Sequence, residues 1–129
     1  PNYYFYGEEL SMMLRAFTRG YSFFHMPDVP IFHLYTDVKN LPRKLHWDPE
    51  DDLNRVTKWQ ELDRRSIQRL DDLVANKLDG SMGLGSERTL DEYASFSGID
   101  LPNKQVLDLQ KATEPRFLES LDWTKNPIA

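Results

Sequence analysis

Residues 3–35 read YYFYGEELSMMLRAFTRGYSFFHMPDVPIFHLY, and this stretch decides the fold. Within it, residues 8–19 repeat apolar side chains three and four positions apart, which predicts an amphipathic helix. Two glutamates in its first turn complement the positive end of the helix dipole, and Gly20 is a good C-terminal stop. The predicted apolar face consists of Leu10, Met13, Leu14 and Phe17. The stretch therefore has one helix at its centre.

The segments on either side of this helix favour extended structure. Tyr3–Tyr6 is an aromatic run typical of the end of a buried strand. Tyr21–Met26 is a second short apolar run, closed by Pro27. In Ile31–Tyr35 the alternation of a strand places His33 among apolar and aromatic neighbours. The sequence thus predicts strand, helix, strand, strand.

The chain from residue 48 onward is predominantly helical in pattern. Asp48-Pro49 is a strong helix start, and the helix is predicted to reach Lys77 with a break near Asp63. Its apolar stripe is traced by Leu53, Val56, Gln60, Ile67, Leu70, Val74 and Lys77. A glycine-spaced loop follows at residues 80–86.

After this loop the pattern predicts a capped helix and then shorter elements. Thr89 and Glu92 match a capping box, and Gly98 ends that helix. Residues 99–103 form a turn, residues 104–111 fit either a strand or a helix, and residues 113–121 fit a last short helix. The fold class is helix-rich α+β.

Composition limits the classes of function that the chain can serve. Its 129 residues, 40% hydrophobic and 29% charged, fit one soluble globular domain. A net charge of −5 gives no electrostatic footprint for nucleic acid, and no apolar run has membrane-spanning length. The absence of cysteine excludes disulfides and thiolate sites and suits a reducing compartment.

Two sets of titratable residues are candidates for chemistry. Glu8 and Glu9 could bind sugar hydroxyls or act as acid and base, or they could only stabilise the helix start. His33 could bind a divalent cation, or it could be a partly buried histidine bonded to backbone. No Asp-x-Asp occurs in the chain, so a metal site would need ligands supplied from outside it.

A third candidate site is the glycine-spaced loop. Its backbone amides could face a phosphate, but it lacks the Lys-Ser/Thr ending of a P-loop, and a tight helix-to-helix turn is the better interpretation. Arg88 after it could touch a phosphate, although a capping or solvated arginine is more common. Arg15 and Arg19 are expected to be helix-surface charges paired with acidic neighbours.

The register of Gly7-Glu8-Glu9, Gly20, Pro27 and His33 resembles the C-terminal half of a GT-A glycosyltransferase domain, as in the polypeptide GalNAc-transferases. The chain is more similar to a GlcNAc-transferase family whose known members include cytosolic enzymes that modify hydroxyproline on a ubiquitin-ligase subunit. Further matching features are Trp47, the arginines Arg64, Arg65 and Arg69, the run Gly83–Leu90, Tyr93 and residues 98–100. The resemblance covers about residues 3–101.

This resemblance implies a site and a reaction. Glu8 and Glu9 would be catalytic, Gly7, Glu8 and Arg88 would bind substrate, and His33 would complete a Mn²⁺ or Mg²⁺ site with its remaining ligands outside this chain. The reaction would transfer GlcNAc from UDP-GlcNAc to a hydroxyl of a protein or glycan acceptor in the cytoplasm.

The resemblance also implies a division of the chain. Residues 1–47 would be the C-terminal part of the GT-A core, and residues 48–129 a helical extension packed on it. Because the chain opens on Pro1 and a packed aromatic run, we expect an excerpt of a longer protein, inactive alone, whose exposed apolar surface would favour a homodimer. The alternative is a non-catalytic helical interaction module, in which the opening stretch is only core.

Overall fold

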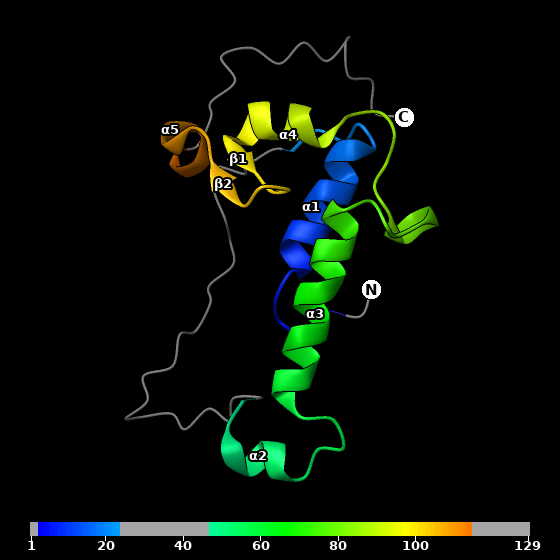
Figure 1. Ribbon diagram of the computed structural model, residues 1–129, viewed down its shortest axis with the longest axis vertical. Helices are drawn as coiled ribbons and strands as arrows, with labels where there is room; N and C mark the ends of the chain where they lie inside the picture. The colour runs from blue at the N-terminus through cyan, green and yellow to red at the C-terminus, as the bar shows by residue number, and fades with distance from the viewer. Residues whose placement is uncertain (1–2, 24–46, 115–129) are drawn as a thin grey trace, which may run out of the picture.

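The computed structural model describes residues 3–23 and 47–114. In this part the chain is helix-rich with a small antiparallel pair of strands, which confirms the α+β class (Figure 1). The helices are α1 (Glu8–Thr18), α2 (Pro49–Leu53), α3 (Trp59–Val74), the short 3₁₀ helix η1 (Gly80–Met82), α4 (Leu90–Ser97) and α5 (Leu109–Thr113). The strands are β1 (Ile99–Asp100) and β2 (Gln105–Val106). The division at residue 47 stays a prediction.

The core of the described residues lies where α1, α3 and α4 meet. In Figure 1, α1 lies along α3, and α4 crosses the C-terminal end of α1, while α2 lies beyond the opposite end of α3. The Phe17 and Tyr93 rings meet edge to face, with centroids 5.3 Å apart. The buried apolar side chains are Leu14, Phe17, Leu70, Leu73 and Tyr93. A small core of three helices therefore supports the rest.

Helix α1 confirms the central prediction of the sequence to within one residue. Leu14 and Phe17 are buried, and Leu10 and Met13 pack against the core, as the spacing predicts. At the C-terminal end, Gly20 adopts φ 84° and its N–H donates to the carbonyl of Phe17. The next N–H, that of Tyr21, donates to Ala16, which completes a Schellman closure.

The predicted strand at Tyr3–Tyr6 is wrong, because a side chain of α3 takes the place of a neighbouring strand. The Tyr4 N–H donates to Ser66 Oγ at 2.6 Å, and the Ser66 hydroxyl lies 3.4 Å from the Tyr4 carbonyl. Phe5 then turns the chain with φ 61°. Residues 21–23 are not a strand either, and the predicted strand at 31–35 lies outside the described residues.

The long helix predicted from Asp48 breaks earlier than expected, between α2 and α3. Pro49 occupies the first turn of α2 as predicted. The buried carboxylate of Asp52 accepts the Trp59 N–H at 2.9 Å and so caps the start of α3. Lys58 Nζ donates to the carbonyls of Asp52 and Leu53, which closes the end of α2. These hydrogen bonds place the break between Leu53 and Trp59 instead of near Asp63.

Helix α3 ends at Val74 rather than Lys77. Asn76 adopts a left-handed φ of 54°, and the Lys77 N–H donates back to the Asp72 carbonyl at 2.8 Å. Part of the predicted stripe is also wrong: Leu53 and Val56 are exposed, because the break removes them from α3. The buried face of α3 comprises Ser66, Leu70 and Leu73.

The end of the described chain follows its local signals. Thr89 and Glu92 form the predicted capping box, and Gly98 ends α4 with φ 76°. Residues 104–111, whose pattern fitted either a strand or a helix, contain β2 and then the start of α5. Two predictions here are wrong: Ile99 and Asp100, predicted within a turn, form β1, and the helix predicted from Thr113 does not begin there, because α5 ends at Thr113 and Glu114 is extended. Residues 115–121 of that helix lie outside the described residues.

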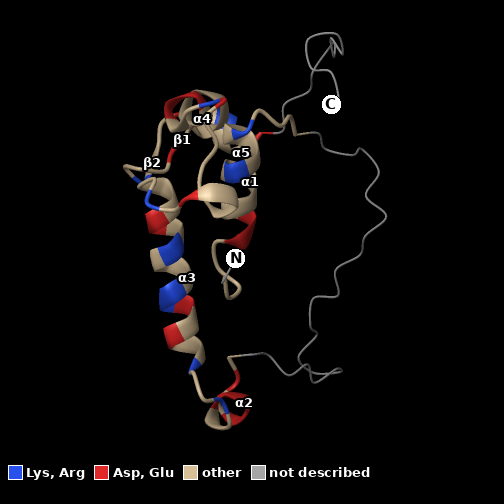
Figure 2. Cartoon of the chain, turned by 90° about the vertical axis from the view of Figure 1, so that its right-hand side faces the viewer, with Lys and Arg blue, Asp and Glu red and all other residues tan. Residues whose placement is uncertain are grey.

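Acidic and basic residues are both spread along α3, as the red and blue segments of Figure 2 show. None of the helices in residues 3–23 and 47–114 has the length and apolar content needed to cross a membrane.

Candidate functional site

Gly7, Glu8 and Glu9 stand at the N-terminal end of α1, where the chain turns sharply. Gly7 has φ 87°, and a Cβ there would lie 3.3 Å from the Tyr3 ring and 3.5 Å from Leu70 Cβ. Both glutamates are exposed to solvent in the first turn. A glycine therefore fits this turn, and it presents two carboxylates from a rigid helix end.

Phe5 lies two residues before this turn, and sequence reasoning misplaced it. Phe5 was predicted inside a strand, but it is 66% exposed and meets Trp47 edge to face at 5.4 Å. Phe5 has a left-handed φ, which is uncommon for a bulky residue and is often found at functional sites. The sequence shows the aromatic run at residues 3–6, but it does not reveal the left-handed conformation of Phe5.

Arg88 is engaged at the other end of α1. Its guanidinium donates to the carbonyls of Tyr21 at 2.9 Å and Gly20 at 3.1 Å. It also lies 5.0 Å from the centroid of the Phe17 ring, within cation–π range. Arg88 therefore fixes the chain where it leaves α1, which is the capping role considered in the sequence.

The glycine-spaced loop is docked on the same end of α1, and the amides of Gly85 and of the two residues after the loop, Glu87 and Arg88, are occupied. Thr18 accepts the Gly85 N–H on its hydroxyl at 2.7 Å, and its carbonyl accepts the N–H groups of Glu87 and Arg88. A Cβ on Gly85 would come within 2.4 Å of the Thr18 carbonyl oxygen. This geometry supports the tight-turn interpretation and leaves these three amides unavailable to a phosphate.

Arg15 and Arg19 hold this loop from α1, so the predicted pairing with acidic neighbours is wrong. Arg15 donates to the Ser81 carbonyl at 2.6 Å and 3.1 Å, and Arg19 donates to the Gly80 carbonyl at 2.9 Å. Arg15 gives the Ser81 carbonyl its hydrogen bonds, and Arg19 adds a second one to the Gly80 carbonyl, which also accepts the Gly83 N–H.

The structure does not bring the predicted substrate-binding residues together. Glu8 and Arg88 lie at opposite ends of α1, whose 11 residues span about 15 Å at the rise of an α-helix. His33 lies outside the described residues. In residues 3–23 and 47–114, no three histidine, aspartate or glutamate side chains gather closely enough to hold a metal ion. The described residues therefore do not form a metal site by themselves.

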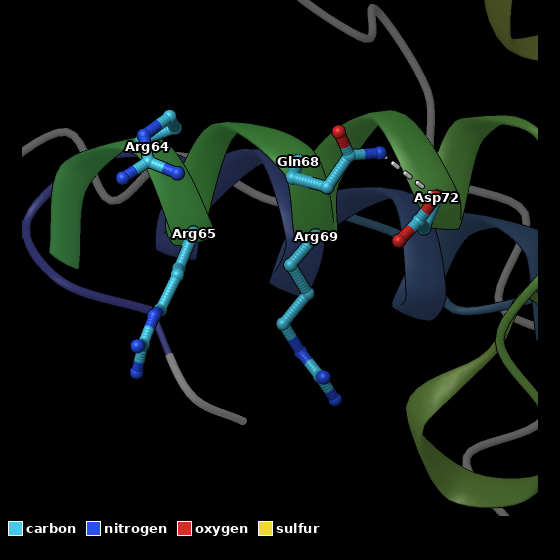
Figure 3. A pocket seen from close by; sticks show the side chains of 5 residues that line it. All are labelled: Arg64, Arg65, Gln68, Arg69 and Asp72. Atoms are coloured by element: carbon cyan, nitrogen blue, oxygen red, sulfur yellow. Dashed lines mark hydrogen bonds between the residues drawn. The ribbon is translucent and has the colours of Figure 1, made fainter. Parts of the chain in front are cut away.

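The sequence did not predict a groove along α3, although it singled out three of its residues as features of a resemblance. The groove has a volume of about 410 Å³ (Figure 3). Its described lining residues are Arg64, Arg65, Gln68, Arg69 and Asp72. Their spacing of one, three and four positions on a helix is the signal that could have revealed a common face.

Comparison with known proteins identifies the family. The model of the family Glycosyltransferase (GlcNAc) matches residues 1–103, which span every described element from α1 to β1. No curated protein and no solved structure matches the chain. A match over most of the chain is enough to assign the family: this chain belongs to the glycosyltransferase (GlcNAc) family.

Proposed function

We propose that the chain is the C-terminal part of a GT-A glycosyltransferase that transfers GlcNAc from UDP-GlcNAc to a hydroxyl of a protein or glycan acceptor. The observation that carries this proposal is the family match over residues 1–103, which supports a transferase. The register from Gly7 to His33, similar to that of GT-A enzymes, supports the finer assignment of the fold, and the description of the family supports GlcNAc as the transferred sugar.

Glu8 and Glu9 supply the carboxylates in this proposal. They are exposed at the start of α1, and the Gly7 turn against Tyr3 and Leu70 fixes the backbone beneath them. A carboxylate there can accept hydrogen bonds from sugar hydroxyls, and one within reach of the acceptor hydroxyl can take its proton as the glycosidic bond forms. The exposed Phe5 lies two residues before Gly7 and offers a ring face to a sugar.

His33 is the proposed ligand for Mn²⁺ or Mg²⁺, with its remaining ligands supplied from outside this chain. A divalent cation would stabilise the charge that develops on the diphosphate leaving group. For Arg88, the bonds to Gly20 and Tyr21 support a positioning role, and direct contact with substrate stays a prediction.

The test is a transfer assay on the protein in its full-length form, with labelled UDP-GlcNAc, UDP-GalNAc, UDP-glucose and GDP-mannose as competing donors. We expect transfer from UDP-GlcNAc, and a loss of about 10²-fold or more in kcat for Glu8→Gln or Glu9→Gln. Glu50→Gln is the matched control, because Glu50 is also an exposed glutamate in the first turn of a helix. His33→Ala should raise the Mn²⁺ concentration needed for transfer, and His25→Ala should not.

Each arm of this assay can contradict one part of the proposal. A preference for another donor would overturn the UDP-GlcNAc assignment. Equal activity of Glu8→Gln, Glu9→Gln and Glu50→Gln would show that Glu8 and Glu9 only stabilise the helix start. An unchanged Mn²⁺ requirement in His33→Ala would remove the metal role.

A non-catalytic interaction module remains the second candidate function, and one observation favours it. Neither glutamate lines the groove on α3, which is instead built from arginines. Absence of transfer with all four donors, together with binding of a polypeptide in that groove, would support this candidate.

A further inference from the structure

The groove on α3 presents two guanidiniums that extend in the same direction. Arg65 and Arg69 are one helical turn apart, and Figure 3 shows their side chains leaving α3 side by side. Gln68 lies between them in sequence and donates from Nε2 to Asp72 Oδ1 at 3.1 Å. Among the described residues no N–H donates to the side-chain oxygen of Gln68, so this oxygen can accept an N–H from a ligand.

The groove carries more positive than negative charge. Glu61 pairs with both Arg64 and Arg65, with a distance of 2.7 Å to Arg65 Nε. Among the described residues, Arg69 has no carboxylate partner; its guanidinium lies 5.8 Å from the centroid of the Tyr3 ring. Its Nε is buried and finds no acceptor in the described part of the chain. A buried N–H of this kind is costly unless an oxygen pairs with it.

The spacing of Arg65 and Arg69 along the axis of α3 indicates the form of the ligand. Residues one turn apart on a helix are separated by about 6 Å along its axis. Alternate residues of an extended chain are separated by about 6.5 Å and point to the same side. Carboxylates on alternate residues of an extended segment therefore match Arg65 and Arg69, and a guanidinium binds a carboxylate with two parallel hydrogen bonds.

The shape of the groove favours a polypeptide over a small molecule. Sites for small ligands enclose most of the ligand surface, whereas the described residues that line this groove all lie along one helix. The Gln68 carbonyl oxygen adds an acceptor suited to a backbone N–H. The excess of arginine complements an acidic partner even though the whole chain has a net charge of −5.

We propose that this groove binds an extended acidic segment of a partner polypeptide, with carboxylates on alternate residues paired to Arg65 and Arg69. The binding is a property of α3 and does not depend on glycosyl transfer. It is steered by charge and weakens as salt screens the exposed part of the groove.

The experiment measures binding of fluorescein-labelled peptides by anisotropy at low and at physiological salt. One peptide carries the sequence Gly-Ser-Glu-Thr-Glu-Ser-Gly, one places the two glutamates next to each other, and one replaces both by glutamine. We expect the alternating peptide to bind about tenfold more tightly than the adjacent isomer, because only one carboxylate of the isomer faces the groove.

Variants of the protein test the assigned residues. Arg65→Gln and Arg69→Gln should each weaken binding about tenfold, and Arg69→Lys should restore only part of it, because lysine keeps the charge but loses the planar fork. Lys111→Gln is the matched control: it removes one positive charge from α5 and should leave the affinity within about twofold. Arg65 is 65% exposed, so its variant tests the groove without disturbing the core.

The proposal is overturned if the two glutamate isomers bind equally, or if Lys111→Gln weakens binding as much as Arg65→Gln. It is also overturned if inorganic pyrophosphate binds the groove more tightly than the alternating peptide, which would indicate a phosphate ligand instead. Absence of transferase activity leaves these outcomes unchanged, so failure of the groove proposal and of the proposed function can be told apart.

Discussion

At the scale of single residues, Thr18 connects α1 to the loop that follows η1. It is buried, its hydroxyl donates to the Leu14 carbonyl at 2.8 Å, and the same oxygen accepts the Gly85 N–H at 2.7 Å. Nothing in the sequence marks this threonine, because its partner lies 67 residues away.

Thr18→Val should lower the free energy of unfolding by about 1–3 kcal/mol, because the isosteric side chain leaves the Gly85 N–H without an acceptor. Thr18→Ser keeps the hydroxyl and should cost less, about 1 kcal/mol for the lost methyl group. Urea unfolding followed by circular dichroism measures both. A larger loss in the serine variant than in the valine variant would contradict the assigned hydrogen bond.

At the scale of elements, the start of α4 shows a local signal that the structure confirms in full. Glu92 accepts the Thr89 backbone N–H at 2.6 Å, and Thr89 Oγ1 accepts the Glu92 N–H at 3.1 Å. The hydrogen bond from the Thr89 backbone, then that from its side chain, and then the charge of Arg88 lower the pKa of Glu92. The capping box therefore makes the stability of α4 dependent on pH.

Because the pKa of Glu92 is lower in the folded state, its contribution is present above the pKa of the unfolded chain. That contribution is lost as the pH falls through the lowered folded pKa. Glu92→Gln keeps a capping side chain but cannot titrate, so the difference in urea midpoint between wild type and this variant should shrink from pH 7 to about pH 3. A constant difference would contradict the link. Thr89→Ala removes the cap itself and should cost about 0.5–2 kcal/mol at every pH.

At the scale of the whole molecule, packing determines which apolar residues of α2 and α3 are buried and so contribute to stability. Leu73 is fully buried between the helices, whereas Leu53 is 75% exposed at the end of α2. The predicted stripe included the exposed Leu53 and left out the buried Leu73, so the sequence pattern did not rank the two leucines by burial.

Leu73→Ala should lower the free energy of unfolding by about 2–5 kcal/mol, because it opens a cavity in the core. Leu53→Ala, the same chemical change at an exposed position, should stay within about 0.5 kcal/mol of wild type. Thermal or urea unfolding of the two variants compares them directly, and equal losses would contradict the placement of the core.

The candidate site divides in the same way between what sequence could and could not predict. Glu8 and Glu9 at a helix start were predictable, because glycine and two acidic residues before an amphipathic repeat are local signals. The separation of Arg88 from Glu8 by the length of α1 was not, because it depends on where the loop after η1 docks. The shared groove of Arg65 and Arg69 needed the buried face of α3 to be known first.

The sequence by itself determined the helix α1 with its glycine boundaries and the capping box of α4. These features depend on periodicity and on bonds between residues a few positions apart, which the chain order contains. Only the tertiary structure decided that Tyr3–Tyr6 pairs with Ser66 instead of a strand, that Asp52 divides the long helix, and that three arginines share one groove. Each of these depends on a partner brought close by packing, whose competing bond outweighs local preference.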